Sequence, residues 1–302
     1  MTTPAISVHN LIRTFGHTRA LDEFSMTVET GEVRGFLGPN GSGKSTTIRI
    51  LLGMIRADSG DAQVLRLDPW KDSVTLHHRI AYVAGDTALW PNLTGGETID
   101  MLTRHRTGMD VQKRKQELLE RFELDPTKKT RTYSKGNRQK VALVAALCSD
   151  ADVYFLDEPT SGLDPLMEVT FQNEVRRLAQ SGKTILLSSH ILGEVEKLCD
   201  TVTIIRAGKD VLSGPLSQLR HLTRSTVSAT VPHDSDNLAQ LDSVHDYVRE
   251  GDQVTFHVDD RDIEAVLPRL LEMSVRNLTI TPPSLEDMFL QHYGDELPVT
   301  KS

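Results

Sequence analysis

The chain has 302 residues, of which 38% are hydrophobic and 25% are charged, values typical of a globular protein with one large core or with a large and a small domain. Its net charge of −8 argues against bulk binding of nucleic acid. The longest nearly unbroken apolar run, Val141–Cys148, is far shorter than the roughly 20 residues that span a bilayer.

The first residues lack the basic and apolar regions of a signal peptide. Cys148 and Cys199 are isolated and have no metal-type spacing. This pattern favours two buried thiols in a reducing cytosol over a disulfide.

The N-terminal part alternates between strand-like and helix-like patterns. A helix is predicted from Thr46 to Ile55, where apolar residues recur with the 3.6-residue period of a face packed on a sheet. Ser59 to Asp61 is predicted to be a turn. Predicted strands cover residues 6–13, 20–28, 33–37 and 80–83.

A helical and polar insertion is predicted between about residues 89 and 147, with Leu118, Leu119 and Phe122 on one stripe. Residues 104–140 contain 12 Lys/Arg against 5 Asp/Glu, whereas residues 226–302 contain 5 against 15. This asymmetry indicates either that the two regions face different surroundings or that both are solvated faces.

The middle of the chain is predicted to complete a largely parallel sheet with helices on its faces. Strands are predicted at 153–156, 184–187 and 201–205, and a helix at 167–180. A glycine-rich loop from Gly38, then Asp157, and then His190 each follow one of the predicted strands. The carboxyl ends of such strands are where α/β sheets bind ligands.

The pattern changes after about residue 222, and we predict a small acidic α+β domain over 223–302. Pro268 is expected to kink or break a helix over 263–273, and Ser284 to cap a last short helix ending near Tyr293. Predicted strands cover 227–231, 247–250, 254–258 and 278–281, with a hairpin turn at 250–253.

The loop after the strand 33–37 has the spacing Gly-x-x-x-x-Gly-Lys-Ser. Between a strand and a helix, such a loop binds phosphate through its backbone N–H groups and the helix N-terminus. Lys44 would hold the β- and γ-phosphates and the Ser45 hydroxyl would ligate Mg²⁺. A simple glycine-rich turn would not explain the Gly-Lys-Ser triplet. The predicted nucleotide-binding residues are Gly38, Pro39, Asn40, Gly41, Ser42, Gly43, Lys44, Ser45 and Thr46.

Asp157 and Glu158 end an apolar strand, which is the Walker B pattern. Asp157 is predicted to hold Mg²⁺, directly or through water. Glu158 is predicted to orient and deprotonate the attacking water. Alone, an Asp-Glu-Pro segment after a strand would more often be a helix-entry turn.

Two further segments resemble those of the ABC ATPase family. Tyr133 to Lys140 resembles the family's Leu-Ser-Gly-Gly-Gln signature, and Thr160 to Pro165 resembles its D-loop. His190 resembles the switch histidine. These motifs occur in the ABC order over roughly residues 5–219. The resemblance implies an α/β P-loop NTPase core over 1–222 with a helical subdomain at 89–147, followed by the small α+β domain.

The resemblance also implies how the residues act. Two domains would associate head to tail with two ATP molecules between them, each held by the P-loop of one and the signature of the other. Asp164 would touch the partner's P-loop, His190 would bond the γ-phosphate and Glu158, and Phe15 would stack on adenine unless it is an ordinary core residue. The implied contacts across the interface come from Ser134, Lys135, Gly136 and Gln139.

The chain departs from the family pattern at two places. Gly85 stands where the family has a glutamine that ligates Mg²⁺, so either Asp86 or water would replace that ligand. Lys135 replaces the first signature glycine and Asn137 its glutamine. The pattern Tyr-Ser-Lys-Gly-x-x-Gln, like the tail at residues 283–289, resembles the ATPase subunits of ABC-2-type exporters, the daunorubicin-resistance-like group.

The resemblance thus implies a cytoplasmic ATPase, peripheral on the inner face of the cell membrane, that uses ATP and Mg²⁺ to drive efflux of a drug- or lipid-like substrate. Its partners would be a separate membrane-spanning permease and a second copy or close homologue, and no nucleic acid. We expect the permease to dock near Gly85, Asp86 and the basic helical region. The alternative is a soluble ABC ATPase, without a transporter, that acts on a macromolecular scaffold.

Overall fold

The computed structural model describes residues 3–104, 111–220, 224–231, 238–239, 241, 243–259, 262–273 and 275–281. The chain forms two compact units, Met1–Gly214 and Pro215–Ser302. The boundary expected from the sequence, at residue 222, lies shortly after this division. None of the helices in the described ranges is long and apolar enough to cross a membrane.

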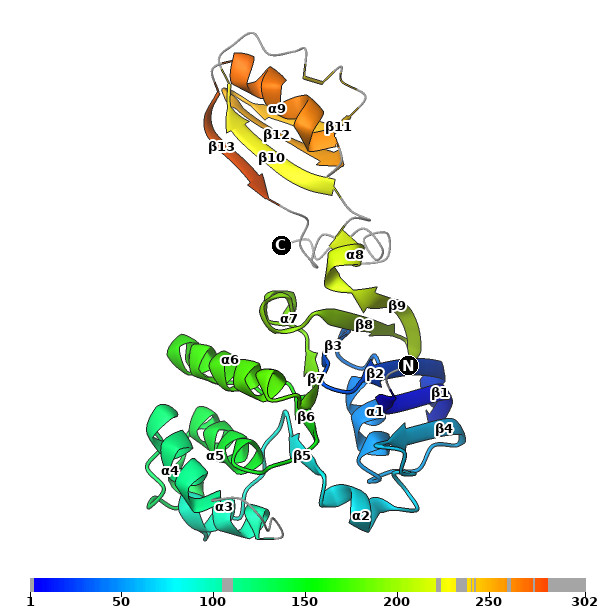
Figure 1. Cartoon of the computed structure of the whole chain (residues 1–302), viewed down its shortest axis with the longest axis vertical. Helices are drawn as coiled ribbons and strands as arrows, with labels where there is room; N and C mark the ends of the chain where they lie inside the picture. Colours follow the sequence, from blue (N-terminus) through cyan, green and yellow to red (C-terminus); the bar gives the residue numbers. More distant parts are fainter. Residues whose placement is uncertain are drawn as a thin grey trace. The chain divides into compact units, whose positions relative to one another are not determined.

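A six-stranded sheet organises the first unit and confirms the predicted α/β core (Figure 1). Neighbouring strands from β5 through β6, β7 and β3 to β8 pair in parallel. Because β6, β7 and β3 are neighbours, the residues that follow them meet at one edge of the sheet. In spatial order the strands are β5 (Ile80–Val83), β6 (Val153–Asp157), β7 (Thr184–Ser189), β3 (Val33–Leu37), β8 (Thr201–Arg206) and β9 (Lys209–Pro215).

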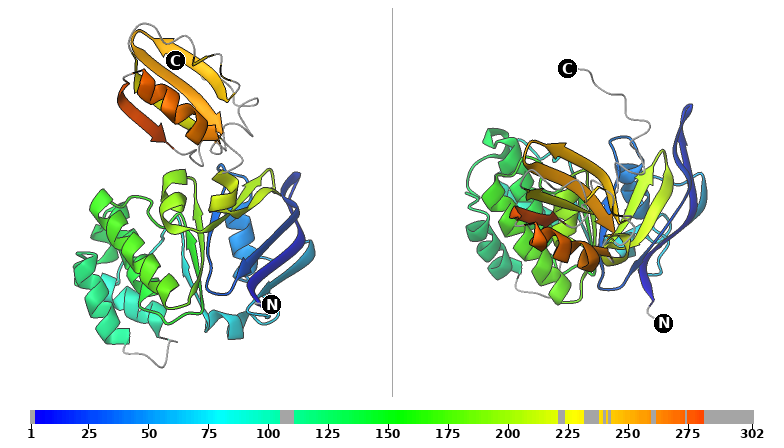
Figure 2. Two further views of the ribbon diagram at one scale, coloured as in Figure 1. Left: turned by 45° about the horizontal axis from the view of Figure 1, so that its top comes forward. Right: turned by 90° about the horizontal axis from the view of Figure 1, so that it is seen from above.

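Helix α1 (Lys44–Leu51) lies between this sheet and a second one, while α6 (Pro165–Gln180) and α7 (Leu192–Leu198) lie on the other side (Figures 1 and 2). The second sheet is antiparallel and was not predicted as a separate layer. Buried apolar residues from both sheets and α1 form one continuous core. The strands of the second sheet are β2 (Thr18–Glu29), β1 (Pro4–Phe15) and β4 (Ser59–Val64).

Two local predictions in this unit were wrong. Ser59 to Asp61 is not a turn but the start of β4, which pairs with β1. Gly60 lies at an irregularity in that pairing, where a Cβ would come within 2.3 Å of the Asn10 carbonyl oxygen. In sequence, a glycine at such a bulge cannot be distinguished from a glycine in a turn. Helix α1 ends at Leu51 rather than at Ile55.

The predicted helical insertion is confirmed, and the stripe of Leu118, Leu119 and Phe122 is buried. Several of its basic side chains form ion pairs: Lys115 with Asp100, and Arg121 with Glu174. The positive excess of this region is therefore partly compensated at short range. The insertion contains α3 (Gly95–Thr103), α4 (Val111–Arg121), a short 3₁₀ turn (Thr130–Thr132) and α5 (Lys135–Leu147), and it follows α2 (Ser73–His77), which was not predicted.

The second unit contains a four-stranded antiparallel sheet with α9 (Ile263–Glu272) packed on one face (Figures 1 and 2). Pro268 was predicted to kink or break this helix, and it lies inside α9 without ending it, so the helix is not broken there. Val266 and Leu270 are buried against the sheet, and this packing compensates for the backbone hydrogen bond that proline removes. The strands, in spatial order, are β11 (Val244–Glu250), β12 (Gln253–Asp259), β10 (Arg224–Thr230) and β13 (Arg276–Thr281), preceded in the chain by α8 (Leu216–Arg220). The predicted helix from Ser284 and the tail motif at 283–289 lie outside the described residues.

Cys148 and Cys199 are free and buried, which confirms the predicted thiols. Burial raises the pKa of the Cys148 thiol to about 11 and also raises the pKa of Cys199. Since the thiolate is the reactive form, we expect iodoacetamide at pH 8 to label both cysteines far more slowly in the folded protein than in guanidinium. Mass spectrometry after timed alkylation measures the labelling, and rapid labelling of the native protein would contradict this expectation.

The raised thiol pKa values also affect stability. Because they are raised in the folded state, the free energy of unfolding should decrease as the pH rises above the ordinary thiol value of about 8.5.

Candidate nucleotide-binding site

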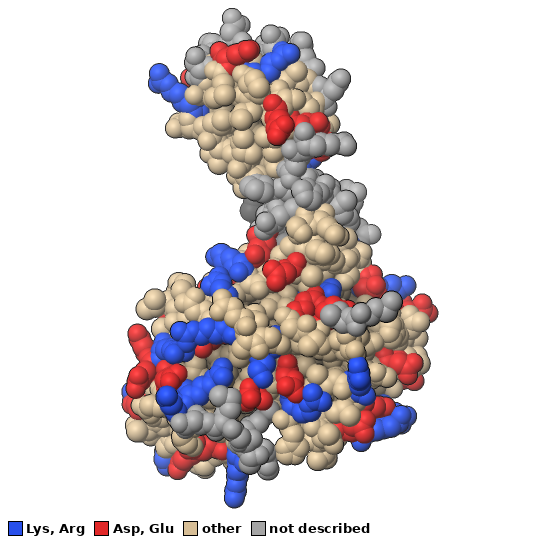
Figure 3. Space-filling model, in the orientation of Figure 1, with Lys and Arg blue, Asp and Glu red and all other residues tan. Residues whose placement is uncertain are grey.

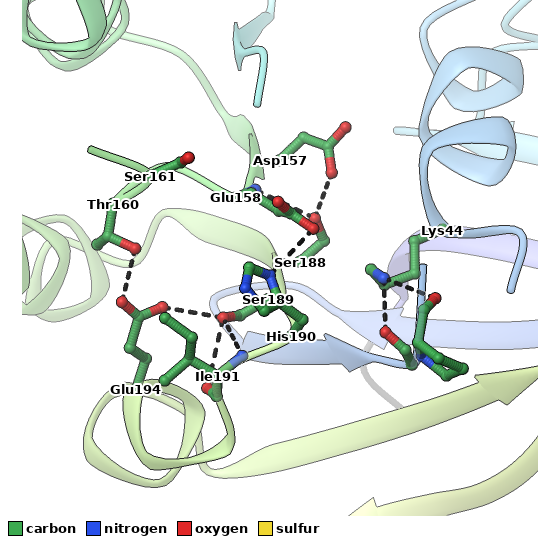
Figure 4. A network of polar contacts seen from close by, with 12 residues as sticks. Lys44, Asp157, Glu158, Thr160, Ser161, Ser188, Ser189, His190, Ile191 and Glu194 are labelled. Carbon is green, nitrogen blue, oxygen red and sulfur yellow. Dashed lines mark hydrogen bonds and ion pairs between the residues drawn. The ribbon is translucent and has the colours of Figure 1, made fainter. Parts of the chain in front are cut away.

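Lys44 is the first residue of α1, and its side chain folds back onto the backbone of the loop between β3 and α1 (Figure 4). Its Nζ donates to the carbonyl oxygens of Gly38, at 2.6 Å, and Pro39, at 3.2 Å. Burial lowers the pKa of the Lys44 ammonium, and the nearby carboxylates of Glu158 and Asp157 oppose that shift. The loop thus presents a desolvated cation beside two carboxylates.

Two glycines of the loop adopt backbone conformations that other residues rarely adopt. Gly41 and Gly43 have φ values of 81° and 118°, in the region that favours glycine. The Ser42 hydroxyl is buried and has no hydrogen-bond partner in the described part of the chain. The predicted residues thus span the loop and the first turn of α1, with Asn40 and Gly41 exposed and the hydroxyl-bearing Ser45 and Thr46 half-buried.

Asp157 is the last residue of β6 and Glu158 follows it, beside the loop that carries His190. Asp157 is 6% exposed and accepts a hydrogen bond from the Ser188 hydroxyl. Glu158 has a φ of 46°, which is unusual for a residue other than glycine. Its backbone N–H donates to the Ser188 carbonyl at 3.0 Å, and its Oε1 lies 3.2 Å from His190 Nδ1 (Figure 4). The structure therefore brings together the two residues that were predicted to be catalytic.

A buried glutamate that the sequence analysis did not identify lies beside this pair. Glu194 on α7 is 8% exposed and accepts hydrogen bonds from the hydroxyls of Thr160 and Ser189, at 2.6 and 2.9 Å (Figure 4). A single glutamate in a helical pattern resembles a solvent-facing residue. Only its position four residues after His190 would have suggested that Glu194 belongs to the site.

The predicted signature residues begin α5 and contact the D-loop of the same chain. Ser134 is exposed and caps α5, accepting a hydrogen bond from the Asn137 N–H at 3.2 Å. Lys135 Nζ donates to the Ser161 hydroxyl at 2.9 Å. A Cβ on Gly136 would lie 2.4 Å from the Gly162 carbonyl oxygen.

Asp164 is likewise exposed and caps the next helix, α6, accepting from the Met167 N–H at 3.0 Å. Two capped helix N-termini, each favourable for an anion, thus begin near the contact between the signature and the D-loop.

Gln139 is placed differently from the other predicted nucleotide-binding residues, because it is only 1% exposed. Its Nε2 donates to the carbonyl oxygens of Pro159, at 3.1 Å, and Ala84, at 3.4 Å, and its Oε1 accepts from the Thr87 hydroxyl at 2.7 Å. With its amide engaged inside the fold, Gln139 connects the segment after β5 to the segment after Glu158.

Phe15 ends β1 and is 46% exposed, which argues against an ordinary core role. The guanidinium of Arg13 lies over its ring, 4.6 Å from the centroid, a cation–π arrangement. Arg13 also pairs with Asp58 at 2.6 Å. One face of the aromatic ring is thereby covered.

The donors predicted for Mg²⁺ are a hydroxyl and carboxylates, the oxygen ligands that this ion prefers. Ser45 and the buried Asp157 fit that requirement. Asp86 is exposed, and no described contact joins its side chain to either of them, so its role stays a prediction. Gly85 lies against the backbone of Asp157, with a Cβ position 3.2 Å from that residue's carbonyl oxygen. Across the described ranges no three His, Cys, Asp or Glu side chains converge on a metal position, and Mg²⁺ takes most of its ligands from phosphate and water at such sites.

Known proteins match both units of the chain. A family model described as ABC transporter matches residues 21–161, and one described as the C-terminal domain of DrrA1-3-like ATP-binding proteins matches residues 214–293. The daunorubicin/doxorubicin resistance ATP-binding protein DrrA of Streptomyces peucetius is 31% identical to this chain. The match covers 97% of this chain and 93% of the Streptomyces protein. The Nod factor export ATP-binding protein I of Ralstonia nicotianae is 32% identical to this chain, and the match covers 98% of this chain and 95% of the Ralstonia protein.

Among solved structures, the dimeric structure of a bacterial ABC transporter cassette has a TM-score of 0.62 and 25% identity, covering 70% of this chain and 98% of its own. The relatives extend over both units. The chain therefore belongs to the ATP-binding proteins of ABC transporters, a family of ATPases, and to the group with a DrrA1-3-like C-terminal domain.

Proposed function

We propose that this chain is the ATP-hydrolysing motor subunit of an export complex, and that two copies, or one copy and a close homologue, close head to tail around two ATP molecules. One observation carries the proposal. Ser134 is an exposed helix cap on α5, which lies with α3 and α4 and away from α1 and its Lys44 (Figure 1). Each chain would thus present two complementary halves of a site, as in the dimeric cassette that it resembles.

The residues have distinct roles in this proposal. The N–H groups of the loop and Lys44 bind the phosphates. Glu158 accepts the proton of the attacking water, and His190 holds Glu158 and the γ-phosphate in line. Ser45 and Asp157 would hold Mg²⁺, which supplies positive charge against the charge developing on the transferred phosphoryl group.

Residues on the adjoining surfaces complete the pocket. The adenine base would stack on the face of Phe15 opposite Arg13. Ser134 and the N-terminus of α5 would bind the γ-phosphate held by the other copy, while Asp164 contacts that copy's loop. Gln139 would act from inside the fold, by holding the segment after Glu158, rather than by touching nucleotide.

A membrane-spanning permease is the proposed second partner. An apolar groove of about 550 Å³ is lined by the segment after α1 and by α2, β5, α3 and α5. Its residues include the exposed Met54, Val74 and Leu102. An apolar helix or loop of a permease would fit it. Lys and Arg side chains on the visible face of this region are interspersed with Asp and Glu (Figure 3), so apolar contact would provide more of the affinity than charge.

The export role is favoured over a scaffold-bound ATPase because the relatives matched along the full chain are named for drug resistance and for Nod factor export. We therefore place the chain in the cytoplasm, on the inner face of the membrane beside its permease. A drug- or lipid-like molecule is the proposed class of substrate.

Mixing two inactive variants tests the shared site. Lys44→Ala removes the phosphate-binding cation, and Ser134→Asp repels phosphate while keeping a residue that caps α5 well. We expect each variant alone to lack ATPase activity. A 1:1 mixture should recover up to about a quarter of the wild-type rate, because half of randomly formed dimers are mixed and one of their two sites is intact. A mixture as inactive as its components, although both variants are folded and dimerise, would overturn the proposal.

A further inference from the structure

We propose that Glu194 is a positioning residue whose buried carboxylate holds the loop of Glu158 and the loop of His190 at a fixed separation. The proposal rests on the proposed function, because it assigns Glu194 to the hydrolysis that those two residues perform. Glu194 touches neither of them in the described contacts. It acts through one hydroxyl on each loop (Figure 4).

The two hydroxyls belong to the two loops that must stay in register. Thr160 comes two residues after Glu158, and its Oγ1 donates to Glu194 Oε1 at 2.6 Å. Ser189 directly precedes His190, and its Oγ donates to Glu194 Oε2 at 2.9 Å. Each carboxylate oxygen therefore holds one loop, and a single rigid group spans the gap between them.

The Ser189 hydroxyl extends this arrangement to the other side of His190. Its Oγ accepts a hydrogen bond from the Ile191 backbone N–H at 2.9 Å. Ser189 thus donates to Glu194 and accepts from Ile191, so the backbone on both sides of the histidine is fixed. The His190 ring, which is half exposed, stays 3.2 Å from Glu158 Oε1.

The environment of Glu194 indicates that this carboxylate does not serve stability alone. Thr160 is 6% and Ser189 2% exposed, and no ion pair joins Glu194 to another residue of the described ranges. A buried carboxylate held by two neutral hydroxyls is costly compared with an apolar side chain of the same size. Glu174, the buried glutamate of α6, instead pairs with Arg121 and Arg177. It provides a matched control.

Hydrogen exchange and kinetics together test the proposal in the full chain. We expect Glu194→Ala to speed exchange of the Ile191 amide by about tenfold, the effect of losing one well-held hydrogen bond. We expect the same variant to lower kcat by on the order of 10²-fold through misplacement of Glu158 and His190, with the affinity for ATP within about twofold of wild type. Glu194→Gln, whose amide can bond both hydroxyls, should recover most of the activity and protection. Glu174→Ala should leave Ile191 exchange and kcat unchanged even where it lowers the melting temperature.

A double-mutant cycle separates positioning from a general loss of folding. In a His190→Ala background, Glu194→Ala should lower kcat by less than about threefold further, because the loop it holds no longer carries the histidine. Full additivity of the two substitutions would overturn the proposal, as would unchanged Ile191 exchange in Glu194→Ala. If the wild-type protein showed no ATP hydrolysis, the proposed function would fail, yet the exchange experiment would still decide whether Glu194 holds the two loops.

Discussion

Glu158→Gln is expected to lower kcat for ATP hydrolysis by about 10²- to 10⁴-fold, the usual contribution of a general base, while ATP binds almost as tightly as to the wild-type protein. Glutamine has the same shape as glutamate, and its amide oxygen can still lie against His190 Nδ1, which is 3.2 Å from Glu158 Oε1. It has no basic oxygen to take a proton from water. The backbone, with its φ of 46°, remains fixed by the bond to Ser188.

Single-turnover hydrolysis and calorimetric ATP binding measure the two effects separately. Size-exclusion chromatography with ATP should show a longer-lived dimer for Glu158→Gln than for the wild-type protein, since hydrolysis no longer separates the copies. Glu168→Gln, on the first turn of α6, is the control and should hydrolyse ATP normally. Turnover of Glu158→Gln close to the wild-type rate would remove Glu158 as the base.

Gly136→Ala is expected to lower ATPase activity by on the order of 10²-fold without preventing ATP binding at the Lys44 loop. The added Cβ would lie 2.4 Å from the Gly162 carbonyl oxygen, a backbone atom that cannot rotate away. Either the start of α5 or the D-loop must move, and both carry residues assigned to the interface between copies, Ser134 and Asp164.

Gly193→Ala is the matched control, because no heavy atom lies within 4 Å of the added Cβ and alanine favours its helix. Thermal unfolding should show that both variants are folded, and equilibrium binding of a labelled ATP analogue should be unchanged in both. Full ATPase activity of Gly136→Ala would show that the close approach of Gly136 to Gly162 is not required for hydrolysis.

The residues that meet at the sheet edge were predictable because parallel strands deliver their following loops to one side. Motif spacing placed Lys44, Asp157, Glu158 and His190 at strand ends, and the structure brings Glu158 and His190 into contact. The sequence could not show the second sheet, because pairing between distant strands depends on packing rather than on local pattern. For the same reason Gly60, in a bulged strand, resembled a turn.

Isolated polar residues on helices were the hardest to identify. Glu194 and Gln139 each occur in a helical pattern that, by itself, indicates a surface position. Their roles depend on which loops lie above the helix, and that is a property of the assembled fold. They are distinguished by their low exposed fractions, 8% for Glu194 and 1% for Gln139, and by hydrogen bonds to the segment after Glu158.

Lys135 donates a hydrogen bond to Ser161, and Gly136 packs closely on Gly162. In the proposed dimer, the surface that meets a neighbouring copy would consist of the stretch around Gly136 and the stretch around Gly162, which are bonded and packed against each other. Neither can shift while the other stays in place, so an approaching copy that displaces one also displaces the other. Binding of a second copy would therefore move both stretches together.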